Sequence, residues 1–415
     1  MQPLVNRRVI AENHCSMKNL VVLLALLLSI NLTVAQGGDP MKEPLLVFEQ
    51  NYQRALESAH LQDKLLFIDF YTDWCAPCKE LDKLVFQNDS IKELLGPKIV
   101  LLRYDAENDT IFHLSKKYHV GSYPTGIILN GEGYILNRRY GFPGDSFDSL
   151  SANVLEFVKE SIELGNNNEI LKGYSNTVRV NKYPSFYAEF VNRTNLKFKP
   201  AQLDEYLKTS EDLLSEEYFA TLSYFASDVS DTIAKATLEN IEEYSKLYGK
   251  NNVETLMYFI VSGKFKRAIF TGEQKVYDDA VEFATEALSS EWTDDILPTF
   301  EKEFLIGQNQ WKKVLEINQE LKSKGELENG YINYFSRQVY TNCEDEEVLD
   351  TCLQWMKDLT TEEPIYPYFS TYALLTQKLG HKEEAKRIAR IAIEIGKQAG
   401  ASTKAMEELV VSLSN

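Results

Sequence analysis

The chain has 415 residues, too many for one small domain, so two or three domains are expected. Hydrophobic residues make up 44% of the chain and aromatic residues 12%, which is enough for a sizeable core and argues against global disorder. The formal net charge of −18 argues against nucleic acid or an anionic membrane surface as a partner. Five cysteines are too few for a secreted disulfide scaffold.

Residues 1–36 are expected to form a cleaved signal peptide. Lys18 supplies a positive charge, residues 20–32 are mainly apolar, and Thr33–Ala35 offer a cleavage site of small residues. The apolar run is short for a membrane span, so a retained N-terminal anchor is the alternative. Met17 is the expected start of translation. The prediction implies an extracytoplasmic, periplasmic protein, in a compartment where disulfides form.

The first clear strand is predicted over Leu65–Tyr71, which is apolar and β-prone except for Asp69. Apolar residues from Phe48 to Ala59 recur at helical spacing, so a helix is expected before this strand. A carboxylate inside an apolar run either faces water at a pleat position or is buried for a function.

Two cysteines follow where this strand gives way to a helix that is expected to run to about Leu95. Cys75 lies at the helix N-terminus, and Cys78 lies about one turn inside the helix. The partial positive charge and unpaired N–H groups of a helix N-terminus favour a thiolate and lower the pKa of a cysteine there. Cys75 is therefore the predicted nucleophile, and Cys78 is the thiol that closes the disulfide.

A Cys-x-x-Cys pair is also half of many zinc sites, and it can be an inert structural disulfide. The zinc alternative is weak, because the chain has no second such pair and because His113 and His119 lack a four-ligand pattern. We expect no metal and no soluble cofactor, since the Cys75–Cys78 pair itself carries the electrons.

Residues 69–79, with the sequence DFYTDWCAPCK, resemble the active-site segment of the thioredoxin superfamily. Residues 79–86 are more similar to the C-terminal domain of DsbD-type reductases, and the whole resemblance covers residues 44–163. It implies an α/β thioredoxin-like domain, with a central mixed sheet flanked by helices, in residues 37–165. It also implies a thiol–disulfide oxidoreductase whose partners are disulfide-containing proteins and an electron-donor thiol protein.

The resemblance assigns roles to residues around the cysteines. Asp69 would be a buried acid with a raised pKa that exchanges a proton with Cys78. Pro124 would be a cis-proline that turns the backbone of Tyr123 toward an extended substrate. The superfamily often has a lysine near the start of the next strand, where this chain has Leu101, so the details of proton transfer stay open. The expected substrate-binding residues rim an apolar groove: Trp74, Ala76, Pro77, Tyr123, Pro124 and Gly141.

The remaining elements of this domain alternate between strands and helices. The apolar patterns and the turn residues between them predict strands over 99–104, 126–129 and 134–140 and helices over 111–120 and 150–162.

Residues 166–415 read as a succession of amphipathic helices after the boundary at Gly165–Asn168. Turns at 307–311, 342–346 and 380–384 lie about 34–38 residues apart, and the last unit resembles a tetratricopeptide (TPR) helical hairpin. An irregular helical domain is the alternative. TPR-like hairpins form surfaces for a peptide or protein partner. The alternative role for this half is to pack on the redox domain or to mediate self-association.

Cys343 and Cys352 lie nine residues apart in this half. A bridge needs Cα atoms within about 7 Å, so two isolated thiols are favoured over a disulfide.

The leading functional hypothesis is an exported thiol–disulfide oxidoreductase that reduces or isomerises disulfides. Ala76-Pro77 resembles the reducing members more than the oxidising members, which carry a histidine before the second cysteine. The alternative is a helical-repeat adaptor whose thioredoxin-like domain is an accessory redox sensor.

Overall fold

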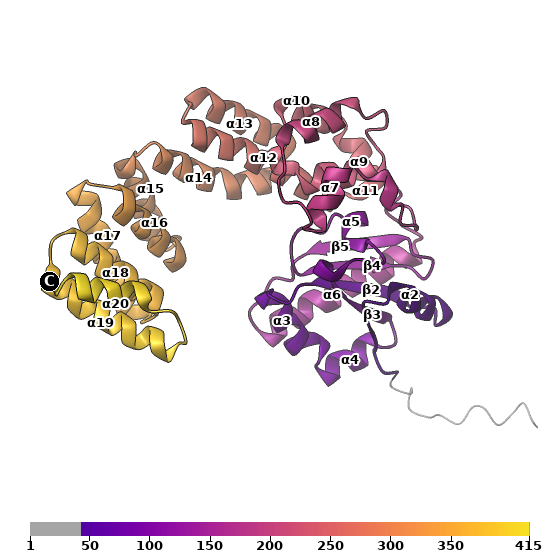
Figure 1. Ribbon diagram of the computed structural model, residues 1–415, viewed down its shortest axis with the longest axis horizontal. Coiled ribbons are helices and arrows are strands. Elements are labelled where there is room, and N and C mark those ends of the chain that lie inside the picture. Colours follow the sequence, from indigo (N-terminus) through magenta and orange to yellow (C-terminus); the bar gives the residue numbers. More distant parts are fainter. Residues whose placement is uncertain (1–42, 415) are drawn as a thin grey trace, which may run out of the picture. The chain divides into compact units, whose positions relative to one another are not determined.

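The computed structural model describes residues 43–414, which form two compact units (Figure 1). The N-terminal unit comprises residues 43–112 and Ser122–Ile170, and the helical unit comprises His113–Gly121 and residues 171–414. The expected signal peptide, its membrane-anchor alternative and the start at Met17 fall outside the described residues. Among residues 43–414, none of the helices combines the length and the hydrophobicity needed to cross a membrane.

A five-stranded sheet in the order β1-β3-β2-β4-β5 forms the centre of the N-terminal unit. β1, β3 and β2 run parallel, whereas β4 is antiparallel to β2 and β5 is antiparallel to β4. The strands are β1 (Leu46–Glu49), β2 (Leu65–Tyr71), β3 (Ile99–Asp105), β4 (Thr125–Leu129) and β5 (Ile135–Tyr140). This is the mixed sheet that the sequence predicts, with β1 as an additional strand at one edge.

Helices cover both faces of this sheet. One face packs against α3, η1, α4 and α6 through a shared apolar core that includes Phe67, Val85 and Phe157. α2 packs against β1, β2 and β3. The helices are α2 (Tyr52–Leu61), α3 (Ala76–Leu81), the π-helix η1 (Asp82–Phe86), α4 (Asp89–Leu95), the 3-10 helix η2 (Ala106–Asn108) and α6 (Phe147–Asn166).

Two helix predictions in this unit are wrong in their bounds. Phe48 lies in β1, because α2 begins only after Asn51, whose side chain accepts a hydrogen bond from the N–H of Arg54. The helix that begins after Cys75 does not continue to Leu95. It ends with η1, and α4 begins anew because the side chain of Asn88 caps it.

The division between the units differs from the sequence boundary at 165/166. Ile170 packs against the core of the N-terminal unit, so the division follows that residue. The helix expected over 111–120 is reduced to α5 (Leu114–Lys117), which belongs to the helical unit. His113 and His119 have φ values of 54° and 39°, left-handed conformations that a right-handed helix does not accommodate.

The rest of the helical unit contains helices and no strand among the described residues after Ile170. The turns predicted at 307–311, 342–346 and 380–384 each separate two consecutive helices. Cys343 and Cys352 are free, buried thiols. The elements are η3 (Val180–Lys182), α7 (Ser185–Val191), α8 (Pro200–Thr209), α9 (Glu216–Tyr224), η4 (Ala226–Asp228), α10 (Asp231–Glu239), α11 (Ile241–Tyr248), α12 (Lys250–Thr271), α13 (Gln274–Ala287), α14 (Ser290–Gly307), α15 (Trp311–Lys324), α16 (Asn329–Asn342), α17 (Glu346–Glu362), α18 (Tyr366–Lys378), α19 (Lys382–Gln398) and α20 (Lys404–Ser412).

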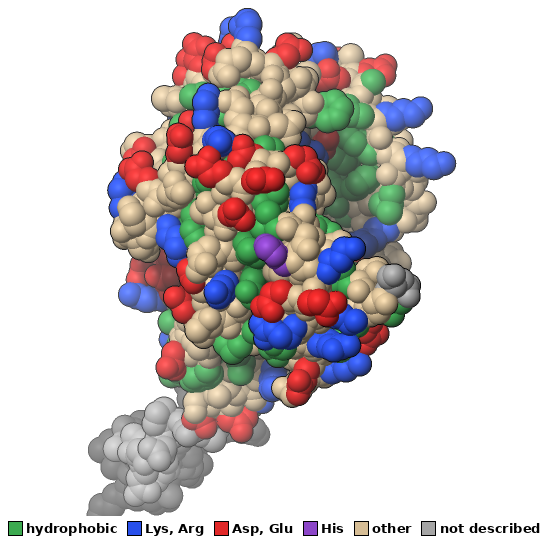
Figure 2. Space-filling view, turned by 90° about the vertical axis from the view of Figure 1, so that its left-hand side faces the viewer, with side chains coloured by type: hydrophobic (Ala, Val, Ile, Leu, Met, Phe, Trp, Pro, Cys, Tyr) green, Lys and Arg blue, Asp and Glu red, His purple; other side chains and the backbone are tan. Residues whose placement is uncertain are grey.

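Charged side chains of both signs are mixed on the face that Figure 2 shows. Acidic side chains lie among lysines and arginines there, with small apolar areas between them. The acidic side chains on this face therefore do not form a patch of a single sign.

Gly126 in β4 tests how tightly the N-terminal core is packed. A Cβ atom at this position would lie 2.7 Å from the ring of Phe142, 3.0 Å from that of Phe157 and 3.1 Å from that of Phe67. We expect Gly126→Ala to lower the free energy of unfolding of this unit by about 1–3 kcal/mol, because these three rings also contact one another. Urea unfolding followed by near-UV circular dichroism measures the change.

Gly165→Ala is the matched control, since its Cβ would make only ordinary contacts, the nearest at 3.4 Å from Leu136. Its effect should stay within about 1 kcal/mol. Equal stability of the Gly126→Ala variant and the wild type would contradict the tight packing.

Candidate redox site

The two cysteines lie at the turn between β2 and α3. The N–H of Cys75 donates to the carbonyl of Thr72 over 3.1 Å, which closes the turn. Cys75 is the N-cap of α3, and its Sγ accepts a hydrogen bond from the N–H of Cys78 over 3.2 Å. Pro77 lies in the first turn of α3, where a proline costs no helical hydrogen bond. The turn thus places one sulfur at the positive end of the helix.

Cys75 and Cys78 are joined as a disulfide. The S–S distance is 2.04 Å and the Cα–Cα distance is 5.3 Å. The residues are only 3% and 2% exposed, whereas the neighbouring Trp74 is 60% exposed. An exposed tryptophan therefore lies beside the shielded disulfide and offers apolar contact area there.

Asp69 in β2 is buried, with 1% of its surface exposed. Its neighbours in the sheet are Arg103 of β3 and Gly126 of β4. Since side chains alternate along a strand, Asp69 shares the face of Phe67, which α3, η1 and α6 cover. Burial raises the pKa of Asp69 to about 7 and outweighs the opposing effect of Arg103. The acid can therefore bind or release a proton near neutral pH.

Arg103 is a member of this site that the sequence analysis missed. Its Nε lies 3.1 Å from Oδ2 of Asp69, in an ion pair rather than a well-aligned hydrogen bond. The guanidinium also pairs with Asp82 of η1 and lies over the ring of Tyr71, 4.7 Å from its centroid. Leu101 pairs with Phe67 in the sheet, whereas Arg103, two residues later in β3, pairs with Asp69 and supplies the cation beside it. The signal was present, because one arginine interrupts the apolar run 99–104.

The loop before β4 contains the expected cis-proline. The Tyr123–Pro124 peptide bond is cis, and the carbonyl of Pro124 accepts a hydrogen bond from the N–H of Gly141 over 2.8 Å. Gly141 has a φ of 73° and nothing within 4 Å of the place where a Cβ would lie. A glycine is thus required there by backbone conformation and not by lack of space.

Ring contacts connect this loop to the cysteine turn. The rings of Trp74 and Tyr123 meet edge to face with centroids 5.9 Å apart. The indole N–H of Trp74 donates to Oε1 of Glu107 over 2.9 Å, so a carboxylate from η2 lies beside the cysteine turn. No local pattern indicates a role for Glu107, because its hydrogen bond joins residues 33 positions apart in the chain.

The other expected groove residues lie as follows. Ala76 and Pro77 are exposed in the first turn of α3, whereas Pro124 is buried. Among the described residues, no group of three or more His, Cys, Asp or Glu side chains is placed to hold a metal ion.

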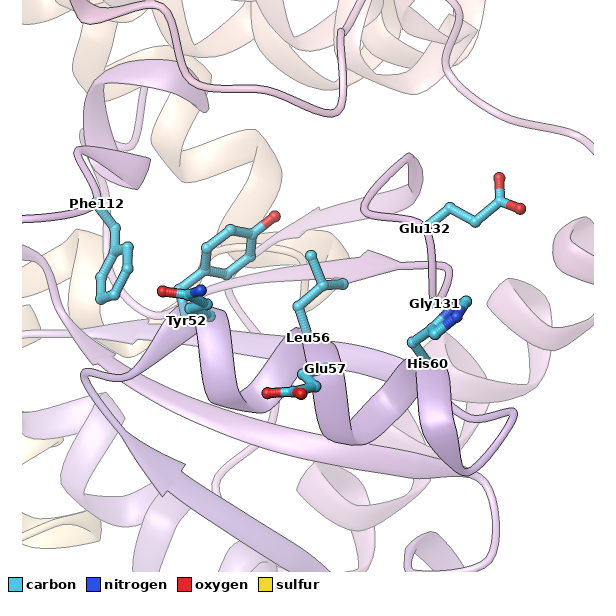
Figure 3. A pocket seen from close by; sticks show the side chains of 8 residues that line it. Tyr52, Leu56, Glu57, His60, Phe112, Gly131 and Glu132 are labelled. Carbon is cyan, nitrogen blue, oxygen red and sulfur yellow. The ribbon is translucent and has the colours of Figure 1, made fainter.

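A separate pocket of about 550 Å³ lies over α2 (Figure 3). Figure 3 shows Tyr52, Leu56 and His60 on α2 and Phe112 at one end of the pocket, with Glu132 of the β4–β5 turn at the other. The rings of Tyr52 and Phe112 are in edge contact, 5.9 Å between centroids. None of the expected site residues lines this pocket, so it is not the redox site.

The profile of a family described as thioredoxin-like matches residues 47–131. Thioredoxin-1 of Drosophila melanogaster is 34% identical over 110 residues, which are 26% of this chain and 92% of that protein. The chain belongs to the thioredoxin family. Together with the Cys75–Cys78 disulfide, this membership identifies the chain as a thiol–disulfide oxidoreductase.

Proteins of the Dsb type are also similar to this chain. The thiol:disulfide interchange protein DsbD of Yersinia pestis (strain Pestoides F) is 34% identical over 77 residues, 18% of this chain but only 13% of DsbD. The thioredoxin-related protein DsbJ of Chlamydia pneumoniae is 26% identical over 156 residues, 35% of this chain and 45% of DsbJ. The solved DsbH oxidoreductase shares 21% identity, with 31% of this chain and 93% of DsbH covered and a TM-score of 0.25.

The pKa of Asp69 predicts how stability depends on pH. The pKa of this carboxyl is about 7 in the folded protein and 3.8 in the absence of burial, so folding favours the protonated form. The resulting stabilisation is fully present below pH 3.8 and is lost as the pH rises through 7. The pKa difference of about 3 corresponds to a loss of about 4 kcal/mol. Urea unfolding of the oxidised protein between about pH 4 and pH 8 should show this fall in the wild type and not in Asp69→Asn. The exposed Asp145→Asn variant should follow the wild type, and parallel curves for wild type and Asp69→Asn would contradict the assignment.

The ion pair predicts the effect of removing Arg103. The guanidinium lowers the pKa of Asp69, so Arg103→Met should raise that pKa above its wild-type value of about 7. Titration of the Asp69 carboxyl carbon by NMR measures it. Lys92→Met, which removes an exposed partner of Asp89, is the control and should leave the titration unchanged. A lower or equal pKa in Arg103→Met would mean that this cation does not act on the acid.

Proposed function

We propose that this oxidoreductase is exported and reduces or isomerises disulfides of extracytoplasmic proteins. The observation that carries the proposal is the Cys75–Cys78 disulfide at the start of α3, with Trp74 in ring contact with Tyr123 of the cis-proline loop. The signal-like pattern of residues 1–36 supports export to the periplasm.

The cycle starts from the reduced pair. Cys75 attacks one sulfur of the substrate disulfide as a thiolate, the substrate S–S bond breaks, and the leaving sulfur takes up a proton. The N–H of Cys78, which points at Sγ of Cys75 in the disulfide form, and the N-terminus of α3 both favour the negative charge on that sulfur. The substrate is now joined to Cys75 as a mixed disulfide.

Cys78 then resolves this intermediate. Its thiol gives its proton to the carboxylate of Asp69, and the thiolate attacks Sγ of Cys75. The mixed disulfide breaks, the substrate leaves with its second thiol, and the Cys75–Cys78 disulfide of the structure results. A buried acid with a pKa of about 7 suits this role, because it can accept the proton and later return it.

The substrate would bind along the cis-proline loop. An extended segment pairs with the backbone of Tyr123, while Trp74, Ala76 and Pro77 supply apolar contacts near the sulfurs. Gly141 holds the carbonyl of Pro124 and so supports the loop from β5. Together these residues would line the groove that the sequence predicts.

We favour the reducing direction. Ala76-Pro77 between the cysteines resembles the reducing members of the superfamily, and no soluble cofactor takes part in the exchange. An electron-donor thiol protein must therefore return the Cys75–Cys78 disulfide to the dithiol after each turnover.

The helical unit is the proposed binding surface for a peptide or protein partner. Its helices from α16 to α20 each contact the next helix, a pattern that supports TPR-like hairpins. The alternative function, a helical-repeat adaptor with an accessory redox sensor, would keep this surface without catalysis by the cysteine pair.

Reduction of insulin by dithiothreitol separates the two functions. The wild type should accelerate the reaction, and Cys75→Ser should reduce its rate to that of dithiothreitol alone, because the attacking sulfur is gone. Cys78→Ala should hold substrates as mixed disulfides that mass spectrometry identifies. Cys343→Ala, which removes a buried free thiol, is the control and should keep wild-type turnover. An inactive wild type would favour the adaptor.

A further inference from the structure

Nine residues of the thioredoxin fold belong to the helical unit. The chain leaves the N-terminal unit after Phe112, runs through His113–Gly121 in the helical unit and returns at Ser122. Every residue of α5 (Leu114–Lys117) is buried. Ser122 is followed at once by Tyr123 and Pro124, so the segment leads directly into the proposed substrate-binding loop.

A buried ion pair fixes this segment. Lys117 pairs with Glu216 at the start of α9, and the two side chains are 2% and 4% exposed. The ammonium of Lys117 also donates to the carbonyl of Thr177 over 2.9 Å and to Oγ of Ser175 over 3.3 Å. Oε2 of Glu216 accepts from the N–H and the hydroxyl of Ser175 over 2.9 and 2.7 Å. Because a buried pair holds a defined geometry only when its remaining donors and acceptors are satisfied, this network specifies one position for Lys117.

Further contacts lie on both sides of Lys117. The hydroxyl of Tyr187 in α7 donates to the carbonyl of Lys116. Nε2 of His119 lies 2.7 Å from the hydroxyl of Tyr174. At the end of the segment, a Cβ on Gly121 would lie 3.3 Å from the ring of Tyr224, so the backbone there packs closely on α9. The helical unit therefore holds the segment from Lys116 to Gly121.

Tyr123 is only two residues from this last contact. Consecutive Cα atoms are about 3.8 Å apart, so little slack separates Gly121 from Tyr123. Tyr123 in turn contacts Trp74. We propose that the helical unit positions Tyr123 for protein substrates through the segment 113–121, with Lys117 and Glu216 as positioning residues. This inference rests on the proposed role of Tyr123 in substrate binding.

Two disulfide substrates of different size test the proposal on the full-length protein. We expect Lys117→Met and Glu216→Gln to lower kcat/KM for insulin by about ten- to a hundredfold, mainly through KM, because a shift of the loop misplaces the substrate segment. Glutathione disulfide is too small to need extended pairing with Tyr123, so its rate should stay near that of the wild type. Thermal unfolding of each variant checks that it folds.

Tyr187→Phe is a milder variant that removes one hydroxyl and keeps the ring, so it decides the test if the ion-pair variants do not fold. Lys275→Met, which breaks an exposed ion pair with Asp279 in α13, is the control and should behave as wild type. The NMR signal of the Trp74 indole N–H should move in the Lys117 and Tyr187 variants and stay in place in the control, because it reports the contact with Tyr123.

Three outcomes overturn the inference: unchanged insulin kinetics, equal losses for insulin and glutathione disulfide, or an unmoved Trp74 signal. These are distinct from failure of the proposed function, in which the wild type itself does not turn over either substrate.

Discussion

The register of β2 between β3 and β4 is the constraint on which the site depends. It places Asp69 opposite Arg103 on one side and Gly126 on the other. A shift by one residue would turn Asp69 to the opposite face of the sheet and bring Phe70 under α3. Such a shift is unfavourable, because the buried apolar neighbours of Asp69 would change faces and no longer fit the packed cores on both sides of the sheet. Apolar packing, which plays no part in the redox reaction, thus keeps Asp69 on the face that α3 covers.

Local patterns predicted most of the N-terminal unit. Leu65–Tyr71 is a run of β-prone residues that ends at a turn and a cysteine N-cap, and its strand bounds agree with the structure. β1 escaped detection because its four residues alternate between half-buried and exposed positions and run into a helical pattern. The shortening of the helix expected over 111–120 could not be foreseen, since the hydrogen bonds and ion pairs of this segment are made with residues at least 55 positions later in the chain.

Some residues of the site are recognisable from their neighbours in the sequence, and others join the site only through long-range contacts. Cys75, Cys78 and Pro124 are recognisable from the residues beside them in the chain. Arg103 and Glu107 belong to the site only through contacts with Asp69 and Trp74, which lie more than 30 positions earlier. A pattern in one stretch of sequence cannot report such pairs, because it carries no information on which strands become neighbours.

The burial of Cys343 and Cys352 in the helical unit matters for a protein that exchanges disulfides. Burial raises the pKa of Cys343, and it raises the pKa of Cys352 to about 12. A thiol that stays protonated at neutral pH and has no exposed surface neither attacks a disulfide nor is oxidised with ease. Within residues 43–414, which hold four of the five cysteines, repeated redox cycles can therefore leave these two sulfurs unscrambled. Among these four cysteines, only the Cys75–Cys78 pair supplies readily titratable thiols.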